Sequence, residues 1–140
     1  MKPITEQVST EVELLNDEDL MDAEARMISP HQVRRMRIRA VVKNRYIRMV
    51  IPESVAQQLG FDISGQTLVR YSDGRTAQRP IAQRIRVACC GRASVFNAVV
   101  EPGLETARLG SIVLETLDLV VDAATGSLQP RDPKQIISEA

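Results

Sequence analysis

The chain of 140 residues contains no tryptophan, one histidine, two cysteines, and only two phenylalanines and two tyrosines. A core built by such a chain has to be aliphatic, and few side chains are left to stack on nucleic-acid bases. One histidine and two cysteines do not supply the four ligands of a structural zinc site. No apolar run is long enough to cross a membrane, and the N-terminus lacks a signal-peptide pattern. We therefore expect a cytoplasmic protein without a metal or another cofactor.

The composition is that of a globular protein, but its charges are unevenly distributed. Hydrophobic residues make up 44% and charged residues 26%, the net charge is zero, and the length fits one domain. Within residues 1–25 the acids are Glu6, Glu11, Glu13, Asp17, Glu18, Asp19, Asp22 and Glu24. Within residues 33–48 the charged residues are all basic: Arg34, Arg35, Arg37, Arg39, Lys43, Arg45 and Arg48. We expect the two segments to lie close together, within one subunit or across a dimer.

The residue types that often carry chemistry suggest little of it here. Cys89 and Cys90 are adjacent in a strand-like run that ends at Gly91, so their side chains should point to opposite faces of a sheet. A disulfide between neighbours would need a strained peptide, and we expect two free thiols, one of them facing the core. His31 follows Ser29-Pro30 and is interpreted as a loop or helix-start residue, not a catalytic base.

The hydrophobic pattern of the first half predicts strands and one short helix. In residues 35–40, arginines alternate with methionine, isoleucine and alanine, which is typical of a half-buried strand with a basic outer face. Residues 49–51 form a short apolar run. Pro52 suits the start of a helix over residues 53–59, which Gly60 should end.

The middle of the chain predicts antiparallel sheet. Strands over residues 67–71 and 76–87 flank Ser72-Asp73-Gly74-Arg75, whose Asp-Gly step is typical of a hairpin tip. After the two cysteines the chain should turn and return as a strand over residues 95–100.

Both ends of the chain predict further elements. Residues 17–27 favour a short helix, and a second should run from Ser111, acting as its N-cap, to Leu117. A strand over residues 119–122 should pair with a short return over residues 127–129.

Several landmarks follow one another in a particular order. They are Ala40-Val41-Val42, Ile51-Pro52-Glu53 with Leu59-Gly60, Tyr71-Ser72-Asp73-Gly74-Arg75, Cys90-Gly91-Arg92, Leu109-Gly110, and the run from Leu114 to Asp122. Together they make residues 33–130 resemble one lobe of the retropepsin-like (retroviral-type, clan AA) bacterial aspartic peptidases. Each landmark alone is weak, whereas their joint order and spacing is specific.

This resemblance implies a plan for the whole chain. It implies an all-β, retropepsin-like single lobe with one or two short helices. It places an acidic N-terminal arm at residues 1–32, the retropepsin-like domain at residues 33–130 and a C-terminal tail at residues 131–140. By resemblance, Tyr71, Ser72, Asp73, Gly74 and Arg75 form the flap and line the cleft, and Leu109 and Gly110 are structural.

The catalytic motif of that family does not stand where the resemblance places it. Positions 43–46, which should read Asp-Thr-Gly-Ala, hold Lys43, Asn44, Arg45 and Tyr46. In these peptidases two subunits each contribute one Asp, and the pair shares a proton. A lysine cannot replace a carboxylate in this pair, and an arginine at the glycine position requires a loop of different shape. Asp73 is the nearest substitute by neighbourhood, but its position in Asp-Gly favours a turn residue.

The sequence therefore predicts an inactive homologue of aspartic peptidases, a pseudoprotease that binds a peptide or protein as a homodimer. An active aspartic endopeptidase of the same family is one alternative. Another is binding of nucleic acid or an anionic partner through the arginine-rich strands. Zero net charge, few aromatic residues and an acidic segment able to cover the arginines make nucleic acid the less favoured partner. A small all-β domain of unrelated type also remains open.

Overall fold

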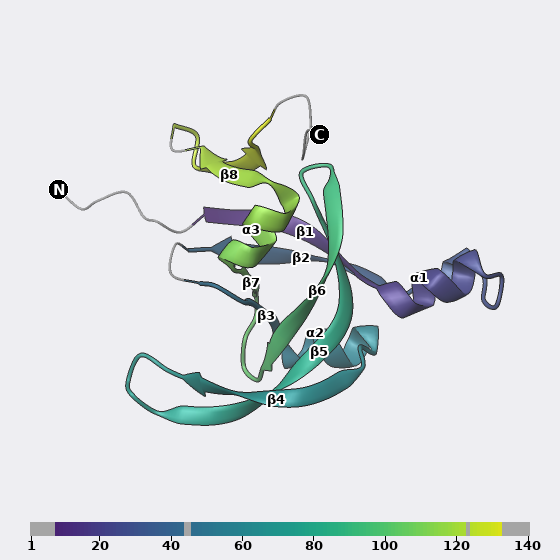
Figure 1. The fold of residues 1–140 in the computed structure, drawn as a ribbon, viewed down its shortest axis with the longest axis horizontal. Coiled ribbons are helices and arrows are strands. Elements are labelled where there is room, and N and C mark those ends of the chain that lie inside the picture. Colours follow the sequence, from purple (N-terminus) through teal and green to yellow (C-terminus); the bar gives the residue numbers. More distant parts are fainter. Residues whose placement is uncertain (1–7, 44–45, 123, 133–140) are drawn as a thin grey trace.

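The computed structural model describes residues 8–43, 46–122 and 124–132, and within them the chain is mostly β-strand (Figure 1). The strands are β1 (Val8–Asn16), β2 (Arg35–Val42), β3 (Met49–Pro52), β4 (Ile63–Arg70), β5 (Thr76–Cys89), β6 (Arg92–Glu101), β7 (Ala107–Leu109), β8 (Leu119–Asp122) and β9 (Ser127–Pro130). The helices are α1 (Asp17–Glu24), the 3-10 helix η1 (Pro30–Gln32), α2 (Glu53–Leu59) and α3 (Ser111–Leu117). The predicted all-β class is confirmed, and the two α-helices expected within residues 33–130 are present.

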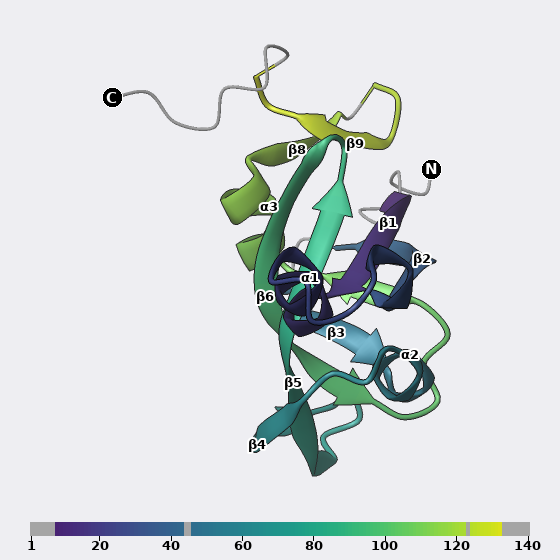
Figure 2. The same cartoon turned by 90° about the vertical axis from the view of Figure 1, so that its right-hand side faces the viewer.

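Seven strands form one curled sheet in the order β1-β2-β7-β3-β6-β5-β4. Because β1 also pairs with β5, the first six strands of this order close on themselves and leave β4 outside. The β4–β5 hairpin projects from the lower end of the molecule in Figure 1, and α1 projects at its side. Figure 2 shows the same sheet from the side, with the separate β8–β9 pair at its upper end.

Strand β2 has the alternation that the sequence predicted. Ala40 is fully buried and Met36 and Ile38 are half-buried, while the arginines between them are exposed. Alternate side chains of a strand point to opposite faces, so the apolar set faces the core and the basic set faces solvent. Other side chains complete an aliphatic core, and the largest that are fully buried are Leu14, Met49, Ile51, Leu59, Ile85, Leu109 and Leu117.

The two helices of the lobe begin differently from one another. Helix α2 follows Pro52 and ends at Gly60, which has a φ of 67° and lets the chain leave the helix in the left-handed region, as predicted. Helix α3 begins at Ser111, so the prediction of Ser111 as N-cap is wrong. Its N-cap is Gly110, because a larger residue does not fit at this position. Glycine has no side chain that could bond the first turn of the helix.

The acidic N-terminal segment lies against the basic strands of the same chain. Strand β1 runs antiparallel to β2, with Glu11 opposite Arg39 and Glu13 opposite Arg37. Glu11 also forms an ion pair with Arg37 at 3.4 Å. Opposite charges across two strands attract each other. The expectation that the two segments meet within one subunit is confirmed, and residues 8–16 of the predicted arm are a strand of the sheet.

Helix α1 is tied to the sheet through its carboxylates. The Asp19 carboxylate accepts hydrogen bonds from Arg34 Nε at 2.8 Å and from Arg34 Nη2 at 3.0 Å. These bonds hold the pKa of Asp19 below its ordinary value. Asp17 pairs with both Arg84 and Arg86 of β5. The insertion between β1 and β2 therefore has a defined orientation although it projects from the sheet (Figure 1).

The two thiols lie side by side, and the prediction that they point to opposite faces is wrong. Cys89 is the last residue of β5, and Cys90 has a φ of 58°, so the alternation of the strand ends between them. The two Sγ atoms are 3.2 Å apart. Both thiols are free, and burial raises the pKa of Cys89 to about 12.

Candidate functional site between the β2–β3 loop and the β4–β5 hairpin

The loop after β2 begins at Lys43 and is held from both sides by backbone hydrogen bonds. Asn44 and Arg45 lie outside the described residues. The Tyr46 N–H donates to the Lys43 carbonyl at 3.2 Å. The Ser111 N–H donates to the Tyr46 carbonyl at 2.9 Å, and the Ile112 N–H donates to the Ile47 carbonyl at 3.2 Å. The first turn of α3 therefore clamps this loop.

Leu109 and Gly110 lie beside the two ends of this loop. Leu109 is fully buried and pairs with Val42 where β7 runs parallel to β2. A Cβ atom added to Gly110 would lie 2.0 Å from the Ile47 carbonyl oxygen, which no real contact allows. A side chain at position 110 would separate α3 from the loop, so glycine is needed for close approach, not for an unusual φ.

The side chains of the loop are cationic and aromatic. Lys43 Nζ lies 5.8 Å from the centroid of the Tyr46 ring, and Arg108 Cζ on β7 lies 5.2 Å from the same centroid. Both distances are within the range of cation–π attraction. Within the described part of the chain, neither Lys43 nor Arg108 has an ion-pair partner. The described residues of the loop offer positive charge and no carboxylate.

The hairpin tip of residues 71–75 is a compact turn. The Tyr71 N–H donates to the Arg75 carbonyl at 2.8 Å, and the Gly74 N–H donates to the Tyr71 carbonyl at 2.9 Å. The Asp73 carboxylate accepts from the Arg75 backbone N–H at 3.0 Å and from Arg75 Nε at 2.6 Å. Both partners of Asp73 lie within the turn, which is the ordinary structural use of an aspartate before glycine.

A buried polar group joins this hairpin to the end of β6. The Tyr71 hydroxyl donates to Glu101 Oε1 at 2.6 Å, and Arg79 Nε lies 2.9 Å from the same oxygen and 2.8 Å from the Tyr71 hydroxyl. Glu101 is 8% exposed. Its pairing with Arg79 satisfies a charge that would otherwise be costly to bury. Hydrogen bonds to Tyr71 and then to Glu101 raise the pKa of Arg79.

Sequence reasoning missed Glu101 and Arg79. The signal for Glu101 is a single acid at the end of the apolar strand 98–100, directly before Pro102. A charge in that position usually has a partner, but its partner lies more than twenty residues away in the chain. The pairing therefore needs the fold.

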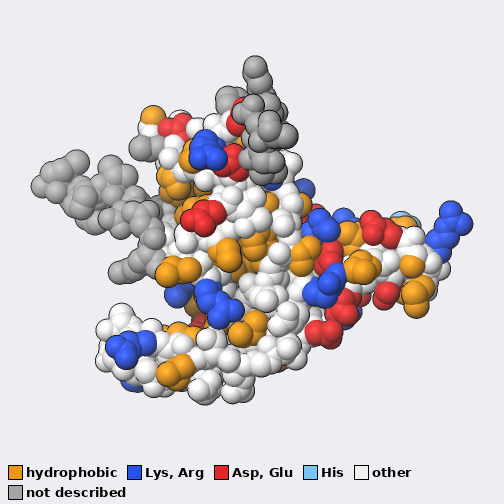
Figure 3. All heavy atoms as spheres, viewed as in Figure 1, with side chains coloured by type: hydrophobic (Ala, Val, Ile, Leu, Met, Phe, Trp, Pro, Cys, Tyr) orange, Lys and Arg blue, Asp and Glu red, His pale blue; other side chains and the backbone are white. Residues whose placement is uncertain are grey.

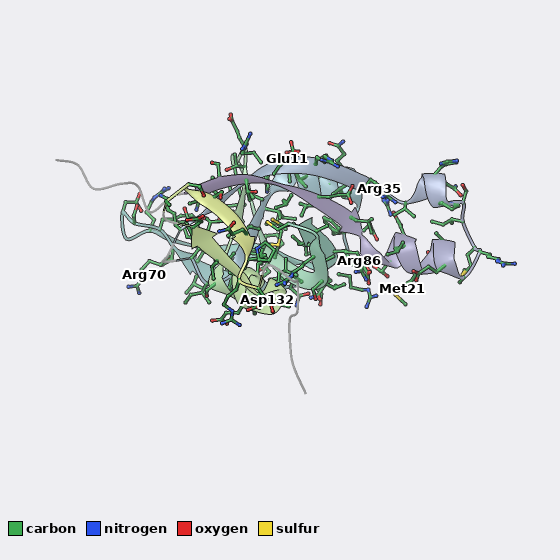
Figure 4. All side chains as sticks on the ribbon, turned by 90° about the horizontal axis from the view of Figure 1, so that it is seen from above. Glu11, Met21, Arg35, Arg70, Arg86 and Asp132 are labelled. Atoms are coloured by element: carbon green, nitrogen blue, oxygen red, sulfur yellow. The ribbon has the colours of Figure 1, made fainter. Side chains whose placement is uncertain are left out.

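The predicted site residues that the structure describes fall into two groups. Within the described residues, no hydrogen bond or ion pair joins the tip 71–75 to Lys43 or Tyr46. Figure 3 shows a hollow between the hairpin and the body of the molecule, with Lys and Arg side chains on both sides. Arg70, at the end of β4, is exposed at the end of the molecule opposite Met21 of α1 (Figure 4).

Neither a metal centre nor a spanning helix is found in the part of the chain that the structure describes. No cluster of three or more His, Cys, Asp or Glu side chains could hold an ion there. No described helix has the length and apolar character to cross a membrane. His31 lies in η1, near the start of that turn, and is exposed.

The curled sheet, the projecting hairpin and the loop clamped by α3 define a retropepsin-like lobe, and solved structures agree. The chain is similar to the retroviral protease-like domain of Ddi1 from Leishmania major, with 16% identity and a TM-score of 0.52 over 69% of this chain and 81% of that one. It is also similar to EIAV protease complexed with the inhibitor HBY-793, with 13% identity and a TM-score of 0.55 over 84% of this chain and 93% of that one. No family model and no curated protein sequence matches the chain.

Proposed function

We propose that the protein is a catalytically inactive homologue of retropepsin-like aspartic peptidases, a pseudoprotease that binds a peptide or protein ligand as a homodimer. The observation that carries the proposal is Lys43, which follows β2 at the position where the resemblance places the catalytic Asp. The peptidase reaction needs two carboxylates that share one proton. An ammonium group has no lone pair with which to accept that proton.

Two carboxylates bonded to residues of the hairpin, Asp73 and Glu101, are both engaged in contacts that hold it. Asp73 is bonded within its own turn, and Glu101 accepts from Tyr71 and Arg79. A general base has to reach a substrate-bound water with a free lone pair. These two acids instead stabilise the hairpin, which supports loss of the reaction without loss of the scaffold.

The charge of the loop suggests the chemistry of the ligand. Lys43 and Arg108 flank Tyr46 without an acidic partner among the described residues, and Arg70 is exposed on the hairpin. A ligand that places carboxylates beside these cations gains charge-assisted hydrogen bonds. We therefore expect an acidic peptide segment in the cleft, with apolar residues between its acids.

The same cations affect the proposed dimer. Two Lys43 ammonium groups about 5 Å apart across a two-fold axis would repel by roughly 3 kcal/mol at an effective dielectric of about 20. The Tyr46 ring, 5.8 Å from Nζ, and the carboxylates of a ligand both reduce this repulsion. Ligand binding and dimer formation should consequently support each other, because an anionic ligand bridges both subunits.

The arginines of β2 give less support to a nucleic-acid site. They are exposed on one face, but Glu11 and Glu13 of β1 lie directly opposite Arg39 and Arg37. Phosphate binding depends on uncompensated positive charge. The neighbouring carboxylates reduce that charge, so the loop and hairpin remain the better ligand site.

Calorimetric titration with a defined peptide tests the proposal. The probe is an octapeptide of alternating glutamate and leucine, and its control replaces each glutamate by lysine. We expect the acidic peptide to bind with one peptide per dimer and the basic control not to bind. Lys43→Ala should weaken the binding of the acidic peptide by roughly tenfold, which equals about 1.4 kcal/mol. Arg37→Gln, on the outer face of β2, should leave the affinity unchanged.

Two results would contradict this ligand site. One is equal binding of the acidic and basic peptides, which would mean that the loop cations do not select the ligand. The other is an affinity that falls with Arg37→Gln but not with Lys43→Ala, which would move the anionic site to the arginine face of β2.

A further inference from the structure

A pocket on the lobe shares only Arg48, the last residue of the β2–β3 loop, with the candidate site. It has a volume of about 530 Å³ and lies between α3, the middle of β6 and an irregularity in β5. Its lining residues are Arg48, Met49, Gln83, Arg84, Val95, Phe96, Asn97, Ile112 and Thr116. None of them belongs to the hairpin tip 71–75 or to residues 43–46. We propose that this pocket binds a singly charged carboxylate carried on an apolar body.

The apolar part of the pocket suits a hydrocarbon or aromatic group. Met49 is fully buried and Phe96 is 8% exposed, whereas Val95 and Ile112 are 37% and 49% exposed. Covering those two exposed side chains removes apolar surface from water, which is favourable. The volume lies within the range of about 300–1,000 Å³ that is usual for small-molecule sites.

The polar part of the pocket consists of hydrogen-bond donors without an acid. Gln83, Asn97 and Thr116 are neutral, and Arg48 and Arg84 are cationic. A small number of placed polar groups in an otherwise apolar wall is the usual composition of a ligand site. Guanidinium groups bind carboxylates through paired hydrogen bonds. The lining therefore selects an anion over a cation.

The charges around the pocket indicate one negative charge on the ligand. Arg84 donates to Asp17, which also pairs with Arg86. Asp17 therefore compensates part of the charge of these two arginines. Arg48 has no ion-pair partner among the described residues. Arg48 is therefore the guanidinium group that is available to a ligand, and one such group fits a monocarboxylate better than a phosphate dianion.

Arg84 has two further features that bear on the pocket. Its φ is 60°, in the left-handed region, at the shift in register between Ala82 and Ile85. Such a bulge redirects a side chain, and strained residues of this kind cluster at functional sites. Its Nε is buried and, among the described residues, has no hydrogen-bond partner. A buried donor without an acceptor is destabilising, and a carboxylate oxygen in the pocket is an acceptor of the required kind.

Nuclear magnetic resonance titration of the full chain with 4-phenylbutyrate tests this site. The neutral control is 4-phenylbutanamide, which has the same apolar body. Acetate and inorganic phosphate are the controls that carry negative charge without an apolar body. We expect saturable shifts of the backbone amides of residues 95–97, 112 and 116 with 4-phenylbutyrate. 4-Phenylbutanamide should bind roughly tenfold more weakly than 4-phenylbutyrate, and acetate and phosphate should bind more weakly still.

Variants connect the binding to the pocket. Arg48→Gln should weaken the binding of 4-phenylbutyrate by roughly tenfold. Arg37→Gln makes the same change at an exposed arginine outside the pocket and should leave the affinity unchanged. A tetrapeptide ending in leucine with a free carboxylate, compared with its C-terminal amide, identifies the source of the carboxylate. If the tetrapeptide with a free carboxylate binds more tightly than 4-phenylbutyrate, the ligand of the pocket is the C-terminus of a polypeptide. If it binds more weakly, the ligand is a small organic acid.

The proposal is wrong if 4-phenylbutyrate causes no saturable shift. It is also wrong if the shifts lie outside the pocket, if the neutral amide binds equally well, or if Arg48→Gln has no effect.

Discussion

Single residues determine how the loop between β2 and β3 is held. Gly110 lets α3 approach the Ile47 carbonyl, and two backbone hydrogen bonds follow from that approach. The retropepsin-like frame around the loop thus depends on a residue without a side chain. Lys43, at the start of the same loop, does not occupy that contact. A positive charge at position 43 is therefore compatible with an intact frame.

Gly110→Ala should destabilise the protein by about 3 kcal/mol, because the added methyl group has to displace backbone atoms. Urea unfolding measures the change through the transition midpoint. Gly65→Ala is the control, since it has a φ of 80° and no atom within 4 Å of its Cβ position. That variant should lose only about 1 kcal/mol, from backbone strain alone. Equal or smaller destabilisation by Gly110→Ala would contradict the close-packing account.

Elements are joined here by a few ionic contacts as well as by the sheet. The pair of Asp19 and Arg34 connects α1 to the start of β2, and the group of Tyr71, Arg79 and Glu101 connects the hairpin to β6. Asp19 and Glu101 are buried, whereas the pair of Glu11 and Arg37 is exposed at both ends. Buried charges depend on their partners far more than exposed ones do.

Arg34→Gln should therefore lower the free energy of unfolding at neutral pH and much less in acid. The pKa of Asp19 is lowered in the folded state, so its contribution is complete above its ordinary value of 3.8 and is lost as the pH falls through the lower folded value. We expect a loss of about 1 kcal/mol at neutral pH, because the Arg34 side chain is 49% exposed and solvent screens the pair.

Unfolding curves at neutral pH and near pH 2 measure this difference, with Arg37→Gln as control. The control should change stability little at either pH, since its ion pair with Glu11 is exposed. The same loss from Arg34→Gln at both pH values would contradict an ionic contribution of Asp19.

Much of the element structure could be predicted because it depends on local pattern. The alternation in β2, the Asp-Gly tip of the hairpin and the glycine that ends α2 are each readable within a few residues. Cys90 and Ser111 were placed wrongly because a positive φ and a close backbone approach decide their positions. The contacts of Glu101 were missed because its partners come from distant segments.

At the scale of the whole molecule, the sheet closes through a pairing that no local pattern indicates. Strand β1 pairs with β5 as well as β2, which links the acidic N-terminal segment to the centre of the lobe. The order of landmarks in the sequence was sufficient to predict the retropepsin-like fold. It could not supply the contacts of Lys43 and Tyr46 or the pocket beside α3.

Incubation of the purified protein with unfolded casein, followed by mass spectrometry, tests the proposed loss of peptidase activity most directly. Between about pH 4 and pH 7, where a carboxylate pair would share its proton, we expect no cleavage that pepstatin inhibits. The wild type and Lys43→Ala should be equally inactive. Pepstatin-sensitive cleavage by the wild type that survives Asp73→Asn but disappears in Lys43→Ala would contradict the account, because it would make Lys43 part of a working catalytic site.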